Sequence, residues 1–359
     1  MFKLISPGDG AIFSVLTDVA REFIRRQEAG EIDGSDGPHE WDSAEYGWLP
    51  PERDLKRDLT YPAAVTFRWK TDGHALPIMF DIFDAGDPSR RTGVTVGRIE
   101  CSAEDGEYFA TAVNFTPGKK YVWRVSAGDE TVERAFSFRE GEIRMIEIDG
   151  TANVRDAGGY MTTSGRRIKY GMIYRGGAID NYVEPQYLLT EKGKDAFIRD
   201  LGIRTDLDLR DDAEEQHFSR SYAGDEVNYL VSQINYYAET IDEKGREYLK
   251  KIFEIFCEPA NYPLYIHCQA GADRTGVVMF YLQGLLGVPD ETIMLDYNIS
   301  SLSIEDERDW YGHPMMPEFL ERISKISPAP TLSESLGNYL YTLGIPAEKL
   351  DRLRDFLLE

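Results

Sequence analysis

The stretch YPLYIHCQAGADRTGVVMFYLQGLLG, residues 262–287, places a cysteine and an arginine at the two ends of a short segment of small and polar residues. The mainly apolar residues 263–268 are typical of a buried strand, and the apolar run after Arg274 is typical of a helix. The first N–H groups of a helix have no partner inside it, and they lie at the positive end of the helix dipole. The stretch therefore predicts a strand, a loop that binds an anion, and a helix.

The residues of this loop have the chemistry that a phosphate ester requires. The small residues 270–272 let the chain turn tightly, and Arg274 can bind two phosphate oxygens through its planar guanidinium group. The same positive field favours a thiolate at Cys268, which can attack phosphorus and form a phosphocysteine intermediate. Thr275 can donate its hydroxyl hydrogen to the sulfur when water releases the phosphate. The loop thus predicts a cysteine-dependent phosphatase site.

Length and composition limit the class of protein. A chain of 359 residues exceeds a typical domain of roughly 100 to 200 residues, so we expect two domains. Hydrophobic residues make up 42% of the chain, which is enough for sizeable cores. The 40 basic and 63 acidic residues give a formal net charge of −23, which argues against nucleic acid and anionic membranes as partners.

The cysteines and histidines predict neither a disulfide framework nor a metal site. The cysteines are Cys101, Cys257 and Cys268, an odd and widely spaced set that indicates free thiols. The five histidines show no metal-ligand spacing with cysteines or paired carboxylates, so we expect no metal and no other cofactor. No apolar run is long enough for a membrane span and the N-terminus does not resemble a signal peptide. We expect a cytoplasmic location, or a secreted or periplasmic one if a signal peptide has been removed.

Residues 1–142 are expected to form an all-β sandwich with a helical insertion. Between about residues 60 and 140, segments of alternating or bunched β-branched and aromatic residues are separated by turn sequences such as TPGKK, and Trp69 and Trp123 are expected in the core. Residues 14–30 show helical spacing of apolar residues. The segment 114–138 resembles the end of a fibronectin type III or immunoglobulin-like module, with Tyr121 at the position of a tyrosine corner. Such a domain could bind a protein or a carbohydrate.

Residues 143–359 alternate between buried strands and helices. The strands are expected at 171–177, 203–210 and 263–268, and the helices at 184–202, 244–258, 290–301, 332–344 and 347–359. This alternation predicts an α/β domain with a mainly parallel sheet flanked by helices on both faces.

Three blocks in this half resemble a known family. HCQAGADRTG, residues 267–276, matches the pattern H-C-x5-R-[ST]-G of tyrosine and dual-specificity phosphatases. Residues 153–177, NVRDAGGYMTTSGRRIKYGMIYRGG, and residues 201–215, LGIRTDLDLRDDAEE, resemble two further blocks of the bacterial tyrosine phosphatase family, in the same order. The resemblance implies hydrolysis of phosphotyrosine in a protein, or of another small phosphoester, through a phosphocysteine and without a cofactor.

The loop chemistry and the resemblance together give a set of candidate site residues. The catalytic candidates are Cys268, Arg274, Asp273 and Thr275, and the substrate-binding candidates are His267, Gln269, Ala270, Gly271, Ala272, Arg155 and Asp211. In the resembling family the aspartate inside the loop has been considered as the general acid, which implies this role for Asp273. Asp211, Asp212 or Glu214 is the alternative acid. Arg155 either lines the pocket or pairs with Asp156, and we favour a structural role with some pocket contact. We expect His267 to orient or stabilise the thiolate.

Three other functions stay open from the residues alone. Many members of the resembling family carry lysine where this chain has Ala272, and the missing charge at the pocket rim favours phosphotyrosine over phosphoinositides or other inositol phosphates. Arsenate reduction or sulfur transfer can use a similar loop, but commonly requires resolving thiols or a loop of different size. A phosphate-reading module without turnover is the third alternative, against which the intact Cys268 and Arg274 argue.

Overall fold

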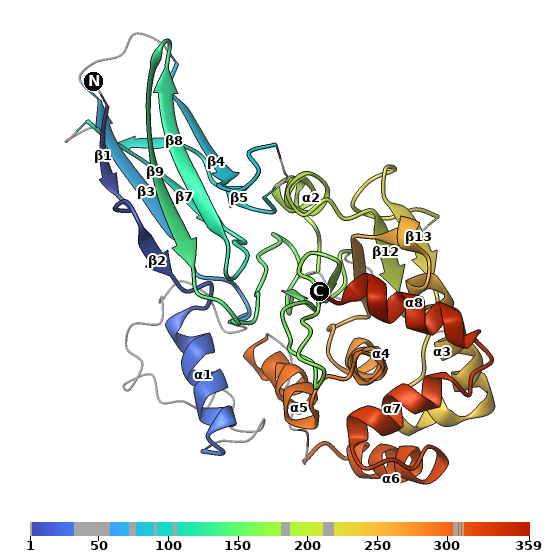
Figure 1. Ribbon diagram of the computed structural model, residues 1–359. Coiled ribbons are helices and arrows are strands. Elements are labelled where there is room, and N and C mark those ends of the chain that lie inside the picture. The colour runs from blue at the N-terminus through green and yellow to red at the C-terminus, as the bar shows by residue number, and fades with distance from the viewer. Residues whose placement is uncertain are drawn as a thin grey trace.

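The computed structural model describes residues 2–31, 58–71, 77–89, 92–102, 106–180, 187–210, 219–303, 308, 310 and 312–359. Figure 1 shows two regions, a β-rich N-terminal half at the upper left and a mixed half whose helices gather at the lower right. The buried apolar residues of the two halves form one continuous cluster, from Phe67 and Trp123 to Leu264 and Val277. The division at residue 142 remains a prediction.

Two sheets make up most of the described N-terminal half. The first has the order β1 (Phe2–Ser6), β3 (Val65–Thr71), β7 (Glu107–Val113) and β5 (Thr95–Val96), and β6 (Glu100–Ser102) also pairs with β7. The second has the order β2 (Ala11–Phe13), β9 (Glu130–Phe138), β8 (Lys120–Ala127) and β4 (Met79–Asp84). The neighbouring strands are antiparallel except β2 and β9, which are parallel.

An aromatic core joins these two sheets. The Phe67 ring of β3 lies 5.4 Å from Trp123 of β8, and Trp69 of β3 stacks on Phe80 of β4 at 5.4 Å. Trp69 and Trp123 are both fully buried, so their predicted place in the core is confirmed. The hydroxyl of Tyr121 accepts a hydrogen bond from the N–H of Thr116 at 3.0 Å, the kind of bond that a tyrosine corner makes. Membership in the fibronectin or immunoglobulin class remains a prediction.

Helix α1 (Asp18–Glu28) confirms the helix predicted in residues 14–30. The hydroxyl of Thr17 caps it by accepting the N–H of Ala20 at 3.2 Å, and Phe23 and Ile24 lie on its buried face. This face belongs to the same apolar cluster as the sheets, so α1 is anchored by hydrophobic burial.

The C-terminal half contains a five-stranded sheet that is mainly parallel, as predicted. Its order is β10 (Arg155–Asp156), β11 (Ile173–Gly176), β14 (Leu264–His267), β12 (Thr205–Asp208) and β13 (Asn228–Val231). The last four strands are parallel and only β10 is antiparallel to its neighbour. The carboxyl ends of the parallel strands therefore meet at one edge, where α/β proteins commonly bind ligands.

Helices surround this sheet. They are α2 (Glu191–Asp195), which continues as a π-helix (Ala196–Asp200), α3 (Glu243–Phe256), α4 (Asp273–Leu286), α5 (Asp290–Asn298), α6 (Met316–Ile326), α7 (Leu332–Leu340) and α8 (Ala347–Leu357). Short 3₁₀ turns lie at Tyr237–Ile241, Pro259–Asn261 and Ile299–Leu302. Helix α4 is buried on every side from Arg274 to Leu286, which explains its continuous apolar sequence. No helix within the described ranges has the length and apolar character for crossing a membrane.

Candidate active site

The predicted strand, loop and helix are present at the centre of the sheet. Strand β14 ends at His267, residues 268–272 form the loop, and α4 begins at Asp273. Because β14 lies between β11 and β12, the loop leaves the carboxyl edge of the sheet with a strand on either side. The sheet therefore fixes the start of the loop, and α4 fixes its end.

Four carbonyl oxygens of the loop are bound on its outer side. Cys268 O lies 3.0 Å from His267 Nδ1, Gln269 O accepts the N–H of Ala178 at 2.8 Å, Ala270 O accepts Asn153 Nδ2 at 3.1 Å, and Gly271 O accepts an Arg175 guanidinium N–H at 2.8 Å. In a trans peptide the N–H of the following residue points away from the carbonyl. The N–H groups of residues 269–272 therefore face the other side, where they can bind the oxygens of an anion.

Gly271 is required by the path of the chain. Its φ is +70°, and a Cβ at this position would collide with the carbonyl of Gly176 at the end of β11. Only glycine combines this backbone conformation with so close an approach. The turn that directs the N–H groups thus depends on Gly271.

Cys268 and Thr275 lie buried at the two sides of this turn. The cysteine is 3% exposed and is a free thiol, as are Cys101 and Cys257. The Thr275 hydroxyl and both polar atoms of the Gln269 amide are buried without a hydrogen-bond partner among the residues that the structure describes. Buried polar groups normally find partners, so the Thr275 hydroxyl and the Gln269 amide nitrogen are suited to donate to sulfur or phosphate oxygens.

His267 directly precedes the cysteine and is buried beside two carboxylates. Its Nε2 lies 3.0 Å from Asp206 Oδ1. Burial lowers the pKa of the imidazole, but the carboxylates of Asp208 and Asp206 outweigh that effect and raise the pKa to about 9. A protonated His267 donates Nδ1–H to the carbonyl of Cys268, and its charge favours an anion in the loop.

Asp273 is held by several groups at the start of α4. Its two oxygens accept hydrogen bonds from Arg308 Nε at 3.1 Å and from the Arg308 terminal nitrogen at 3.0 Å, and Oδ1 also accepts the Tyr237 hydroxyl at 2.6 Å. Burial and the Asp273 carboxylate raise the pKa of Tyr237 well above its usual range, so Tyr237 remains a donor. His313 Nε2 is 3.7 Å from the same oxygen. Neither Tyr237 nor Arg308 was singled out in the sequence, because neither lies near a motif.

Arg274 lies on the first turn of α4 and is 6% exposed. Its guanidinium carbon is 5.1 Å from the centre of the Tyr236 ring, which restricts the position of the side chain.

Ala272 is fully buried, so it does not lie on the open pocket rim where the sequence comparison with lysine had placed it. Asp211, Asp212 and Glu214 lie outside the described residues.

Arg155 has a different place from the one expected for a substrate-binding residue. It is fully buried, and it donates to Asp296 Oδ1 at 2.8 Å and to Asn153 Oδ1 at 2.6 Å. Asp156 pairs with Arg144 at 3.0 Å rather than with Arg155, so the alternative pairing is not formed. Arg155 thus supports the loop through Asn153, whose amide binds Ala270 O.

Asp296 of α5 and Arg175 of β11 complete this support, and the sequence analysis missed both. Arg175 donates to Asp296 Oδ2 at 2.7 Å as well as to Gly271 O. The desolvation of Asp296 is outweighed by Arg155 and Arg175, which hold the pKa of its carboxyl well below its usual range. An arginine inside the apolar strand 171–177 was the available signal, since a buried charge requires a partner.

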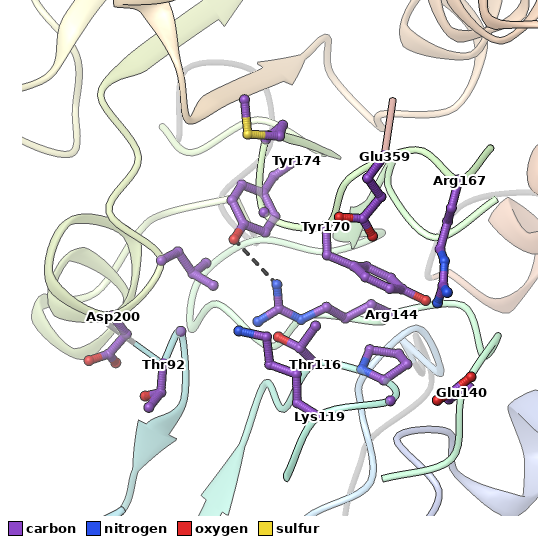
Figure 2. Close-up of a pocket in the computed structure, with 16 residues that line it drawn as sticks. Thr92, Thr116, Lys119, Glu140, Arg144, Arg167, Tyr170, Tyr174, Asp200 and Glu359 are labelled. Atoms are coloured by element: carbon purple, nitrogen blue, oxygen red, sulfur yellow. Dashed lines mark hydrogen bonds between the residues drawn. The ribbon is translucent and has the colours of Figure 1, made fainter. Parts of the chain in front are cut away.

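Two cavities among the described residues lie away from the loop. One, of about 390 Å³, is bordered by Lys119 of the N-terminal half and by Arg144, Tyr170 and Tyr174, and Figure 2 shows Arg144 pointing toward the Tyr174 hydroxyl. The other, of about 590 Å³, lies between the end of α4, the start of α5 and α7. Neither is lined by residues 268–275. The described residues also contain no group of three or more His, Cys, Asp or Glu side chains that could hold a metal ion.

The comparisons with known proteins agree with the site. Residues 146–359 match the model of the tyrosine phosphatase family. A tyrosine-protein phosphatase of Nostoc commune is 29% identical over 150 residues, which are 34% of this chain and 51% of that protein. The putative tyrosine-protein phosphatase OCA1 of Debaryomyces hansenii is 29% identical over 118 residues, which are 32% of this chain and 56% of that protein. The chain thus spans about half the length of these curated relatives.

A solved structure is also similar in part. The core catalytic domain of the PP-IP phosphatase SIW14 from S. cerevisiae, crystallised with citrate, matches 48% of this chain and 90% of its own with 16% identity and a TM-score of 0.28. The match to the family model covers more than half of the chain and includes the whole loop with Cys268 and Arg274. The chain belongs to the tyrosine phosphatase family.

Proposed function

We propose that the protein hydrolyses phosphate monoesters through a phosphocysteine intermediate, with phosphotyrosine as its substrate. The observation that carries the proposal is the orientation of the loop, whose four bound carbonyls leave the N–H groups of residues 269–272 pointing to the opposite side of the loop. These donors and the Arg274 guanidinium match the three non-bridging oxygens of a phosphate group.

The reaction has two steps. The Cys268 thiolate attacks phosphorus, the S–P bond forms, and the bond between phosphorus and the leaving oxygen breaks while that oxygen takes a proton from the general acid. Water then attacks phosphorus, the S–P bond breaks, and the water proton returns to the same acid. The buried Thr275 hydroxyl, next to Arg274 on α4, donates to the departing sulfur.

We assign the acid to Asp273. Its carboxyl group lies at the start of α4, directly after the loop, and the Tyr237 hydroxyl and Arg308 fix its position. The Asp273 carboxyl can exchange a proton with the leaving oxygen only in competition with its ion pair to Arg308. The acid role therefore requires that a bound substrate draw the Asp273 carboxyl toward the leaving oxygen. Asp211, Asp212 and Glu214 are the rival residues.

A single phosphate on an aromatic ring suits this site better than a polyphosphorylated inositol. Arg155, Arg175 and Arg308 lie near the loop, but Arg155 and Arg175 share Asp296 and Arg308 pairs with Asp273, so the three together leave one net positive charge for further phosphate groups. The Tyr236 ring lies beside Arg274 and offers an aromatic surface. The name of the Nostoc commune relative, a tyrosine-protein phosphatase, supports the same substrate.

The test compares p-nitrophenyl phosphate, a phosphotyrosine peptide and inositol hexakisphosphate, all without added metal. We expect turnover of the first two, and kcat/KM at least roughly tenfold lower for the inositol phosphate. Cys268→Ser should fold, bind phosphate and lose turnover, because the loop does not ionise a serine hydroxyl. Mass spectrometry of the acid-quenched wild-type enzyme should find phosphate on Cys268. Full activity of Cys268→Ser would overturn the mechanism, and a preference for the inositol phosphate would overturn the substrate.

A further inference from the structure

Helix α1 of the N-terminal half reaches the phosphatase half beside α5, as Figure 1 shows. In its last turn, Gln27 Oε1 accepts a hydrogen bond from Asn298 Nδ2, at the end of α5, at 3.0 Å. A second contact involves Leu302, four residues after Asn298. Its carbonyl oxygen accepts the N–H of Leu59 at 2.6 Å. Two separate segments of the N-terminal half therefore bind the end of α5 and the 3₁₀ turn that follows it.

Asn298 connects this contact to the segment that precedes α6. Its Oδ1 accepts the backbone N–H of Trp310 at 3.0 Å, so one amide group binds α1 through its nitrogen and Trp310 through its oxygen. Trp310 is 2% exposed, and its ring lies 4.9 Å from Phe280 of α4. A shift of Asn298 would therefore move the backbone at Trp310.

Arg308 lies two residues before Trp310 and binds Asp273. Its backbone is fixed by Ser301, whose hydroxyl accepts the Arg308 N–H at 2.7 Å and donates to Arg308 O at 2.9 Å. Its guanidinium binds both oxygens of Asp273, at 3.1 and 3.0 Å. The contacts thus run from Gln27 through Asn298 to the backbone N–H of Trp310, and Arg308, two residues earlier, binds Asp273.

We propose that Gln27 and Asn298 are positioning residues for the general acid, so that α1 of the N-terminal half is part of the catalytic apparatus. The proposal rests on the proposed function, in which Asp273 gives a proton to the leaving oxygen. Proton transfer requires the two oxygens to be within hydrogen-bond distance, and a small displacement of a catalytic group has a large effect on rate. A role of α1 in stability alone would lower activity on all substrates through the folded fraction, whereas a positioning role depends on the leaving group.

The experiment uses the full chain and two substrates that differ in the need for protonation. Phenyl phosphate has a basic leaving oxygen, and p-nitrophenyl phosphate has a leaving group that departs without a proton. Gln27→Met keeps the side-chain length and removes the acceptor, Gln27→Glu keeps an acceptor, and Glu28→Ala changes the exposed neighbour on the same turn. Gln27→Ala is the second variant if methionine disturbs folding, which circular dichroism reports.

We expect Gln27→Met to lower kcat on phenyl phosphate roughly tenfold and on p-nitrophenyl phosphate less than about twofold. Gln27→Glu and Glu28→Ala should resemble wild type. In the Asp273→Asn background, Gln27→Met should cause no further loss on phenyl phosphate, because the group through which it acts is already absent.

The experiment distinguishes failure of the proposed function from failure of the positioning role. If wild type turns over neither substrate, the proposed function is wrong. If wild type is active but folded Gln27→Met and Gln27→Ala change both substrates equally or change neither, the proposed function stands and the positioning role of Gln27 is wrong. The same conclusion follows if Gln27→Met lowers phenyl phosphate turnover as much with asparagine at 273 as with aspartate.

Discussion

His267 is a buried imidazole surrounded by charged groups. Asp206 and Asp208 face it from β12, and Arg210 follows the same strand. The two carboxylates hold its pKa at about 9 despite burial, whereas a histidine in the unfolded chain titrates near about 6.5. The folded protein therefore binds a proton at His267 that the unfolded chain releases between these two values.

This difference predicts how stability changes with pH. The contribution of His267 is fully present below about pH 6.5, where both states are protonated, and is lost as the pH rises through about 9. The free energy of unfolding should fall by a few kcal/mol across this window, as urea titrations at several pH values would show. His267→Gln should be less stable at low pH and should show a much flatter dependence. Equal slopes for wild type and His267→Gln would contradict a charged His267.

Helix α5 contributes a single carboxylate to four neighbouring segments. Asp296 accepts hydrogen bonds from Arg155 of β10, Arg175 of β11, Tyr160 and Gln283 of α4. Since Arg175 also binds Gly271 O, the position of the loop at residues 268–272 depends on α5, although α5 itself contributes no group to the loop.

Replacement of this carboxylate should therefore be costly. Asp296→Asn keeps the shape of the side chain but leaves two buried guanidinium groups without their charge partner, which we expect to lower the free energy of unfolding by roughly 3–5 kcal/mol. Chemical denaturation measures the loss, and Glu291→Gln on the exposed part of the same helix is the matched control. A loss as small as that of the control would mean that hydrogen bonds, rather than charge, hold the two arginines.

The two halves of the protein are joined by both polar and apolar contacts. Arg144 donates to Asn114 O at 2.7 Å and Phe115 O at 3.2 Å in the N-terminal half, and to Asp156 of β10 at 3.0 Å. Together with the contact of α1 with α5, this arrangement makes the N-terminal half a support for the sheet that carries the loop.

A fragment of residues 143–359 tests how far this support extends. Without the N-terminal half, the fragment exposes apolar surface, and the buried Arg144 guanidinium loses two of its hydrogen-bond acceptors. We expect a fragment that melts at least roughly 5 °C below the full chain and loses more activity on phenyl phosphate than on p-nitrophenyl phosphate. Thermal denaturation and kinetics at matched concentration give both values. An unchanged melting temperature and unchanged kinetics would show that the division at residue 142 separates two independent domains.

The sequence by itself determined the strand, the loop, the helix and the central residues of the candidate site. Cys268, Gly271, Arg274 and Thr275 lie within eight consecutive residues, so the turn and the start of α4 bring them together without help from distant segments. The alternation of strands and helices likewise indicated the parallel sheet, because the hydrophobic period is a local property of the chain.

Only the tertiary structure decided which groups hold this loop in place. Asn153 binds Ala270 O across 117 residues of sequence, and Arg155 binds Asp296 across 141 residues. No helix or strand periodicity relates residues at such sequence separations. The sequence favoured a structural role for Arg155 with some pocket contact, but only the fold shows that its partner is Asp296 of α5. A buried charge must find a counter-charge and hydrogen-bond partners, and packing of distant elements, rather than local pattern, determines which residues supply them.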